Sequence, residues 1–224
     1  MNYITLIATV HKENGRCNSN ELFNIIQCIK PEIIFEELSE EIYNQCYFEQ
    51  NRTTLESIAI KKYLLKNNIK HIPVDTFDIP NFHYDIFNKM LHVLTSNKDF
   101  QLYLDKQIEM EYINGFSFLN SKDNDKRNII IKTYNEKILE NLNDINLKNT
   151  YNYWNEFNNN KESTIIKNIY DYTKNNKYSS GLMFIGSAHR KSIIHKINKY
   201  KRKEEIKINW KFHDFKKTLQ ANGT

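Results

Sequence analysis

The chain has 224 residues, a formal net charge of +5 and 26% charged residues. This length allows one sizeable hydrophobic core and leaves little room for a second independent domain. The 32 basic and 27 acidic residues are interleaved along most of the chain, which argues against a stripe that binds nucleic acid. The compact basic run at 199–203, KYKRK, is short, and we expect no nucleic-acid partner.

The cysteines and the N-terminal residues indicate a cytoplasmic protein. Cys17, Cys28 and Cys46 are odd in number and form no C-x-x-C pair, so we expect neither a disulfide framework nor a zinc knuckle. Residues 1–11, MNYITLIATVH, contain no basic segment before an apolar run of only about eight residues. This pattern predicts a core strand, and neither a signal peptide nor a membrane span.

Hydrophobic periodicity in the first third of the chain predicts strands that alternate with helices. Residues 3–10 form a nearly continuous β-branched and apolar run, which is typical of a strand buried in a parallel sheet. Asn18 with Glu21, and later Thr53 with Glu56, resemble capping boxes that begin helices. The predicted elements here are a strand at 3–10, a helix up to Pro31, a strand at 32–38, a helix up to about Leu65 and a strand at 70–75.

The rest of the chain is mainly helical until a fourth apolar run. The predicted elements are amphipathic helices within 82–148 with an interruption near 114–126, a helix at 163–174, a strand at 181–187, a helix at 191–200 and an edge strand at 205–212. Alternating strands and helices predict an α/β fold, in which helices flank a mostly parallel central sheet. We expect a single domain, 1–224, in which a mainly helical insertion at 82–178, between the third and fourth strands, covers the sheet edge.

Polar side chains that can bind a metal or move a proton follow each predicted strand. In open parallel sheets, ligands bind at the carboxyl ends of the strands, where loops and helix N-termini meet. These side chains are His11, Glu36, Glu37, Asp75, His189, His213 and Asp214. His11 and His189 are the most informative, because each closes an apolar strand at the same edge as Glu37.

Several common chemistries lack the residues that they need. The five glycines form neither G-x-G-x-x-G nor a P-loop, which excludes the usual modes of dinucleotide and triphosphate binding. The sequence contains no H-E-x-x-H, and Ser187 is not part of a G-x-S-x-G nucleophile elbow. A serine hydrolase or a zincin is therefore not expected.

Four segments, taken in order, resemble the TraB/Tiki superfamily, which includes the erythromycin-esterase-like and ChaN-like proteins. They are IATVHKENGRCNSNEL, KPEIIFEEL, KRNIIIKTYNEKI and LMFIGSAHRKSII. By this resemblance, the family's four polar positions correspond to His11, Glu37, Arg127 and His189, with Glu36 as an alternative to Glu37. The first motif departs from the family at Ala8, where glycine is preferred.

The resemblance implies a hydrolase that acts on a peptide or on a small ester or amide. In one version, His11, Glu37 and His189 hold a single divalent metal ion (Zn, Mn or Co) that activates water. In a metal-free version, one histidine is the general base and Glu37 holds its tautomer. Arg127 would polarise a carbonyl or bind a substrate carboxylate, and Asp75 would orient an imidazole.

A different class of protein is also compatible with the sequence. The chain could be a non-catalytic module that binds a partner protein through the aromatic-rich helical insertion. Apolar side chains recur at helical spacing in this insertion, which is more often the sign of a core than of an interface. They are Tyr84, Phe87, Met90, Leu91 and Leu94.

Overall fold

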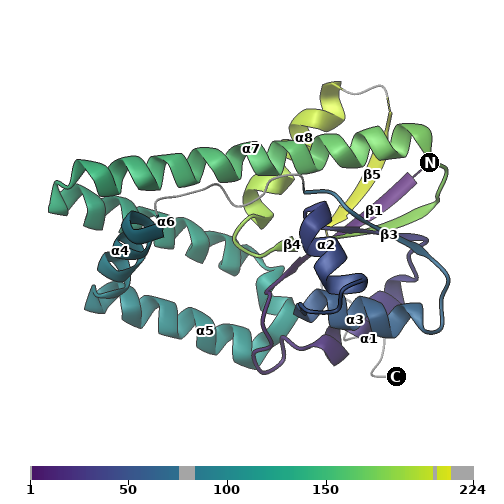
Figure 1. Ribbon diagram of the computed structural model, residues 1–224, viewed down its shortest axis with the longest axis horizontal. Helices are drawn as coiled ribbons and strands as arrows, with labels where there is room; N and C mark the ends of the chain where they lie inside the picture. Colours follow the sequence, from purple (N-terminus) through teal and green to yellow (C-terminus); the bar gives the residue numbers. More distant parts are fainter. Residues whose placement is uncertain (1, 76–83, 204–205, 213–224) are drawn as a thin grey trace.

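The structure, a computed structural model, describes residues 2–75, 84–203 and 206–212 (Figure 1). Its five strands form one parallel sheet in the order β3-β2-β4-β1-β5. The elements are β1 (Asn2–Thr9), α1 (Ser19–Ile29), β2 (Ile33–Glu36), α2 (Glu40–Tyr47), α3 (Leu55–Leu64), β3 (Lys70–Pro73), α4 (Tyr84–Thr95), α5 (Lys98–Leu119), α6 (Lys122–Leu142), α7 (Ile145–Asn175), β4 (Ser180–Gly186), α8 (Arg190–Lys203) and β5 (Ile208–Phe212). The predicted α/β class is confirmed, whereas His213 and Asp214 lie outside the described residues.

Helices cover both faces of the sheet, so the fold has three layers and a hydrophobic core on each face of the sheet. α1 and α3 pack on one face, and α7 and α8 pack on the other (Figure 1). Because side chains alternate along a strand, each of the central strands β1, β2 and β4 contributes residues to both cores. The apolar runs of these strands are buried on both faces, which the sequence predicted for residues 3–10.

The register of the two central strands sets the position of the candidate site. β1 and β4 pair in parallel from Tyr3 opposite Ser180 to Thr9 opposite Gly186. Both strands therefore end at the same level of the sheet. His11 follows β1 by two residues and His189 follows β4 by three, so the turns after the strands bring the two histidines to one edge.

Helices α4 to α7 lie between β3 and β4 in the sequence and form a unit that extends beyond the sheet, while α7 also covers one face of the sheet (Figure 1). They enclose a third hydrophobic core, to which Met90 and Leu94 contribute at 2% and 4% exposure. Phe87 packs against the same core, whereas Leu91 is exposed. Most of the stripe in α4 therefore packs inside the helical unit, and the side chain of Tyr84 lies outside the description.

Three details of the helices differ from the sequence prediction. α2 was not predicted, because Cys46 is its only buried residue and no apolar stripe marks it. α7 is one helix of 31 residues, which begins well before the predicted residue 163. The capping box of α3 consists of Thr54 and Ser57, one residue later than predicted, so Glu56 is not part of the cap.

A glycine turns the end of α5 toward the sheet. Gly115 has φ +56° and ψ −142° inside α5, a conformation that side chains disfavour. After this kink, Phe116, Phe118 and Leu119 join the core beneath α1 and α3.

No helix within the described ranges combines the length and apolar character that crossing a membrane requires.

Candidate active site

Three of the four predicted site residues meet beside Gly186, the last residue of β4. A methyl group placed on the α-carbon of Gly186 would lie 3.4 Å from Glu37 Oε2, 3.5 Å from His189 Cδ2 and 4.0 Å from His11 Nε2. The ends of β1, β2 and β4 thus bring both imidazoles and one carboxylate to the same point. His11, Glu37 and His189 are far apart in the sequence, and they converge here because β2, β4 and β1 are parallel neighbours in the sheet.

His189 is oriented by a carboxylate from the helical insertion. Its Nδ1 lies 2.9 Å from Oε1 of Glu162 on α7, and its Nε2 lies 3.8 Å from Oε1 of Glu37. The hydroxyl of Ser192 donates a hydrogen bond to the other oxygen of Glu162. With a carboxylate oxygen of Glu162 as the acceptor, Nδ1 of His189 is the donor in this contact and Nε2 faces Glu37.

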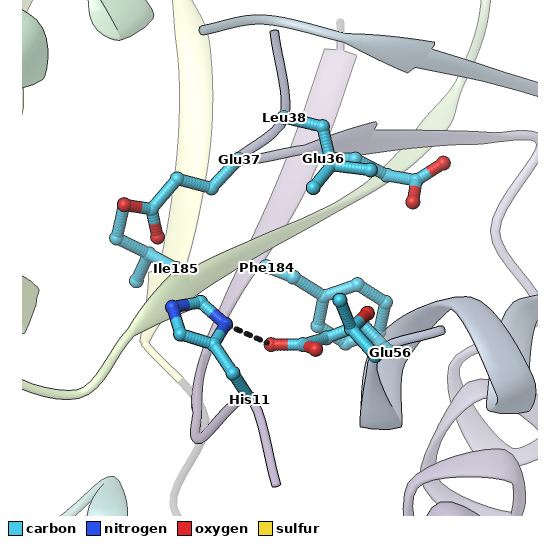
Figure 2. A pocket seen from close by; sticks show the side chains of 8 residues that line it. His11, Glu36, Glu37, Leu38, Glu56, Phe184 and Ile185 are labelled. Atoms are coloured by element: carbon cyan, nitrogen blue, oxygen red, sulfur yellow. Dashed lines mark ion pairs between the residues drawn. The ribbon is translucent and has the colours of Figure 1, made fainter. Parts of the chain in front are cut away.

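His11 has an acidic neighbour of its own. Figure 2 shows the contact between Nδ1 of His11 and Oε1 of Glu56. The two atoms are 3.4 Å apart, and the side chain of His11 is 64% exposed. The same oxygen of Glu56 accepts a hydrogen bond of 2.7 Å from the hydroxyl of Thr9. The contact with Glu56 raises the pKa of His11 above its usual range, although burial acts in the opposite direction.

Glu37 is buried between donors. Its Oε1 lies 2.8 Å from Nζ of Lys161, and its Oε2 accepts a hydrogen bond of 2.6 Å from the backbone N–H of Gly186. Burial acts to raise the pKa of Glu37, but the positive charge of Lys161, the neighbouring His189 and the bond from Gly186 lower it on balance. Glu37 is therefore an ionised, rigidly held carboxylate.

Glu36 points to the opposite side of β2 from Glu37, as successive residues of a strand must (Figure 2). Its two oxygens contact Nδ1 of His71 at 2.7 Å and the hydroxyl of Tyr47 at 2.6 Å. Burial raises the pKa of Glu36, and these two contacts only partly offset it. Glu37 therefore contacts His189, whereas the carboxylate of Glu36 contacts His71 and Tyr47.

The structure gives Arg127 and Asp75 other neighbours than the sequence suggested. The guanidinium of Arg127 lies 5.0 Å from the ring centre of Tyr103 on α5, and no contact in the described part of the chain joins it to the two histidines. The next residue, Asn128, reaches the site loop instead and donates a hydrogen bond of 3.1 Å to the carbonyl of Ser187. Asp75 contacts Nζ of Lys161 at 3.1 Å, while Glu56 and Glu162 are the carboxylates beside the imidazoles.

A small cavity lies between His11 and the two glutamates at the end of β2, Glu36 and Glu37. Its volume is about 20 Å³, which accommodates about one water molecule. The lining residues are His11, Glu36, Glu37, Leu38, Thr54, Glu56, Phe184 and Ile185. The side chain of His11 is largely exposed, so a larger ligand would reach the cavity past this ring.

The predicted metal ligands do not fit a divalent ion in their present arrangement. Both oxygens of Glu37 are engaged, one by the ammonium of Lys161 and the other by the N–H of Gly186. A metal bound to Glu37 would have to displace the lysine, whose positive charge already neutralises the carboxylate. Within the described ranges, no group of three or more His, Cys, Asp or Glu side chains has a geometry that could hold a metal ion.

Sequence reasoning missed three charged residues of this site. Glu56 was assigned to a helix cap, but the cap of α3 lies one residue later, at Thr54 and Ser57, and the carboxylate of Glu56 is directed at His11. Lys161 and Glu162 lie in the polar run NNNKEST, which carries no signal of a site. Only the packing of α7 against the sheet shows that these two residues reach Glu37 and His189.

Comparisons with protein family models, with curated proteins and with solved structures gave no match. The resemblance to the TraB/Tiki superfamily therefore rests on its short motifs, and the function has to be argued from the site itself.

Proposed function

We propose that this protein is a hydrolase that cleaves an ester or amide bond with a water molecule activated by histidine, without a metal ion. The observation that carries the proposal is the convergence of two imidazole–carboxylate pairs, His189 with Glu162 and His11 with Glu56, on the space beside Gly186 and Glu37. Paired imidazoles of this kind suit general acid and base catalysis. The resemblance to the esterase branch of the TraB/Tiki superfamily also supports it.

His189 is the candidate general base. With its hydrogen on Nδ1 and directed at Glu162, its Nε2 accepts a proton from water as the water oxygen bonds to the carbonyl carbon. Glu162 stabilises the imidazolium that forms, and the negative charge of Glu37 at 3.8 Å does the same from the other side. The arrangement resembles the base and orienting carboxylate of other hydrolases in role, not in fold.

His11 is the candidate general acid. Its contact with Glu56 raises its pKa, which favours the protonated form that an acid needs. The bond from the carbonyl carbon to the leaving oxygen or nitrogen breaks as Nε2 of His11 delivers a proton to that atom. Water has then added across the bond, and proton exchange with solvent returns both histidines to their starting states.

The experiment measures hydrolysis of p-nitrophenyl acetate and of an acetyl p-nitroanilide by chelator-treated protein. We expect His189→Ala and His11→Ala each to lower the rate about 10²- to 10⁴-fold. His195→Ala is the matched control, because His195 is an exposed residue on α8 that lies away from the cluster. Equal rates for His189→Ala and the control, both folded by circular dichroism, would contradict the proposal.

A further inference from the structure

Lys161 lies between two buried carboxylates at the edge of the candidate site. Its Nζ is 2.8 Å from Oε1 of Glu37 and 3.1 Å from Oδ2 of Asp75. The lysine side chain is 18% exposed, and both carboxylate side chains are 6% exposed. The contacts join the carboxyl end of β2, the segment after β3 and the middle of α7 through a single ammonium group.

The burial of two carboxylates at one place requires a positive partner. An unpaired buried charge costs several kcal/mol, and like charges held close together increase this cost. The ammonium of Lys161 supplies one positive charge and hydrogen bonds to both carboxylates, which is the role that a bound cation takes in many acidic sites.

The two imidazoles have the contacts that metal-ligating histidines usually have. In zinc proteins, a ligating histidine usually donates its second ring N–H to a carboxylate, a backbone carbonyl or a water molecule. His189 and His11 both have this feature, through Glu162 and Glu56, and their Nε2 atoms face the space beside Glu37. The carboxylate ligand is withheld, because Lys161 and Gly186 engage both oxygens of Glu37.

We infer that Lys161 takes the place of a divalent cation in this site, so that the protein binds no divalent metal there as long as the lysine is present. Replacement of Lys161 by a neutral residue then leaves Glu37, Asp75 and the two imidazoles without their cation and creates a site for one metal ion. This inference rests on the contacts of Lys161 and does not depend on the proposed hydrolase activity.

The test is a titration of chelator-treated protein with Co²⁺, followed by visible absorption and by the melting temperature. We expect wild type to bind no stoichiometric Co²⁺, and Lys161→Met to bind one ion per chain with a rise in melting temperature. Lys161→Gln, which keeps a hydrogen-bond donor, is a second neutral variant in case the Met variant is too unstable. Lys167→Met on the exposed side of α7 is the control and should behave as wild type.

A second substitution locates the ion. In the Lys161→Met background, His189→Ala should abolish Co²⁺ binding, whereas His195→Ala should leave it unchanged. Wild-type protein that binds one Co²⁺ in a manner lost with His189→Ala would overturn the inference. So would neutral variants that fold but bind no Co²⁺, or that fail to fold even when Co²⁺ is present. Since the readout is metal binding, these results are distinct from a failure of the hydrolase assay.

Discussion

Glu162 and His189 are joined by a contact of 2.9 Å between Oε1 and Nδ1, although the first lies on the helical insertion and the second on the turn after β4. This contact makes the insertion part of the candidate site, since α7 supplies the carboxylate that orients the imidazole. The adjacent residue of α7, Lys161, contacts Glu37 in the same way. One turn of α7 therefore contacts two site residues, His189 and Glu37, that follow strands of the sheet.

Glu162→Gln should lower the rate of p-nitrophenyl acetate hydrolysis by about a hundredfold or more, with little change in KM. The amide keeps the shape of the side chain, but it cannot stabilise an imidazolium at His189 as a carboxylate does. The control is Glu156→Gln, which changes an exposed glutamate on the same helix and should leave the rate unchanged. If Glu162→Gln retains the wild-type kcat with normal melting behaviour, Glu162 does not orient a catalytic base.

Gly186→Ala should fold normally and lose hydrolase activity. Its new methyl group would be in ordinary contact at 3.4–4.0 Å with Glu37, His189 and His11, so it fills the point where they converge without a clash. We expect a melting temperature equal to or slightly above that of wild type, since alanine loses less backbone entropy on folding.

Gly181→Ala, in the same strand, is the control, because it should lower the stability of the fold and leave the activity unchanged. There the methyl group would lie 3.2 Å from Ile4 and 3.3 Å from Phe35 and Tyr178, which is tighter than ordinary packing. It should cost about 1–3 kcal/mol of unfolding free energy, while the activity of the folded protein is retained. Full activity in Gly186→Ala would show that the space beside Gly186 is not where the reaction occurs.

The strands could be predicted from the sequence because their signal is local. The runs at 3–10 and 181–187 are mainly apolar, and the structure buries residues 4–9 and 181–185 in the middle of a parallel sheet. The parallel arrangement in turn predicted which side chains would share an edge, and His11, Glu37 and His189 do lie together. The order β3-β2-β4-β1-β5 has no local signal, because the pairing of β2 with β4 crosses the whole insertion.

The charged residues around the histidines could not be predicted, because their meaning depends on tertiary packing. The sequence around Glu56 is compatible with a role in the helix cap and with a role beside His11. A shift of one residue in the start of α3 decides between these two roles. Lys161 and Glu162 are typical of an exposed helix until α7 is placed on the sheet. Side chains that orient a site from a distant element therefore leave little trace in a single sequence.

The pKa of His11 should depend on Glu56. In wild type, the titration of His11 followed by NMR should give a pKa above the usual 6.5, and Glu56→Gln should lower it. A folded-state pKa raised above the unfolded value stabilises the fold below the unfolded pKa, and this contribution is lost as pH rises through the folded pKa. The difference in melting temperature between wild type and Glu56→Gln should accordingly shrink as pH rises from about 6 to about 9.

The same titration contains its own control. His195 is exposed and has no contact with Glu56, so its chemical-shift titration should be the same in both proteins. An unchanged pKa for His11 in Glu56→Gln would mean that the 3.4 Å contact does not set its protonation, and the assignment of His11 as the acid would lose its support.

Asn120→Ala should remove two hydrogen bonds that join the helical insertion to the sheet. The amide of Asn120 accepts a hydrogen bond of 2.8 Å from the backbone N–H of Ala8 and donates one of 3.0 Å to its carbonyl. These backbone groups lie beyond Leu6, where the described pairing of β1 with β5 ends, so Asn120 satisfies groups that the sheet leaves open. Their loss in a buried position should cost about 2–4 kcal/mol of unfolding free energy.

The matched control is Asn114→Ala, since Asn114 is an exposed residue of α5 whose amide bonds only within its own helix. Urea denaturation of the two variants gives the comparison, and Asn114→Ala should stay within about 0.5 kcal/mol of wild type. Because Ala8 lies three residues before His11, Asn120→Ala should also weaken hydrolysis under conditions in which the variant is folded. Equal stability of the two variants would show that the end of α5 does not anchor the edge of β1 on which the candidate site depends.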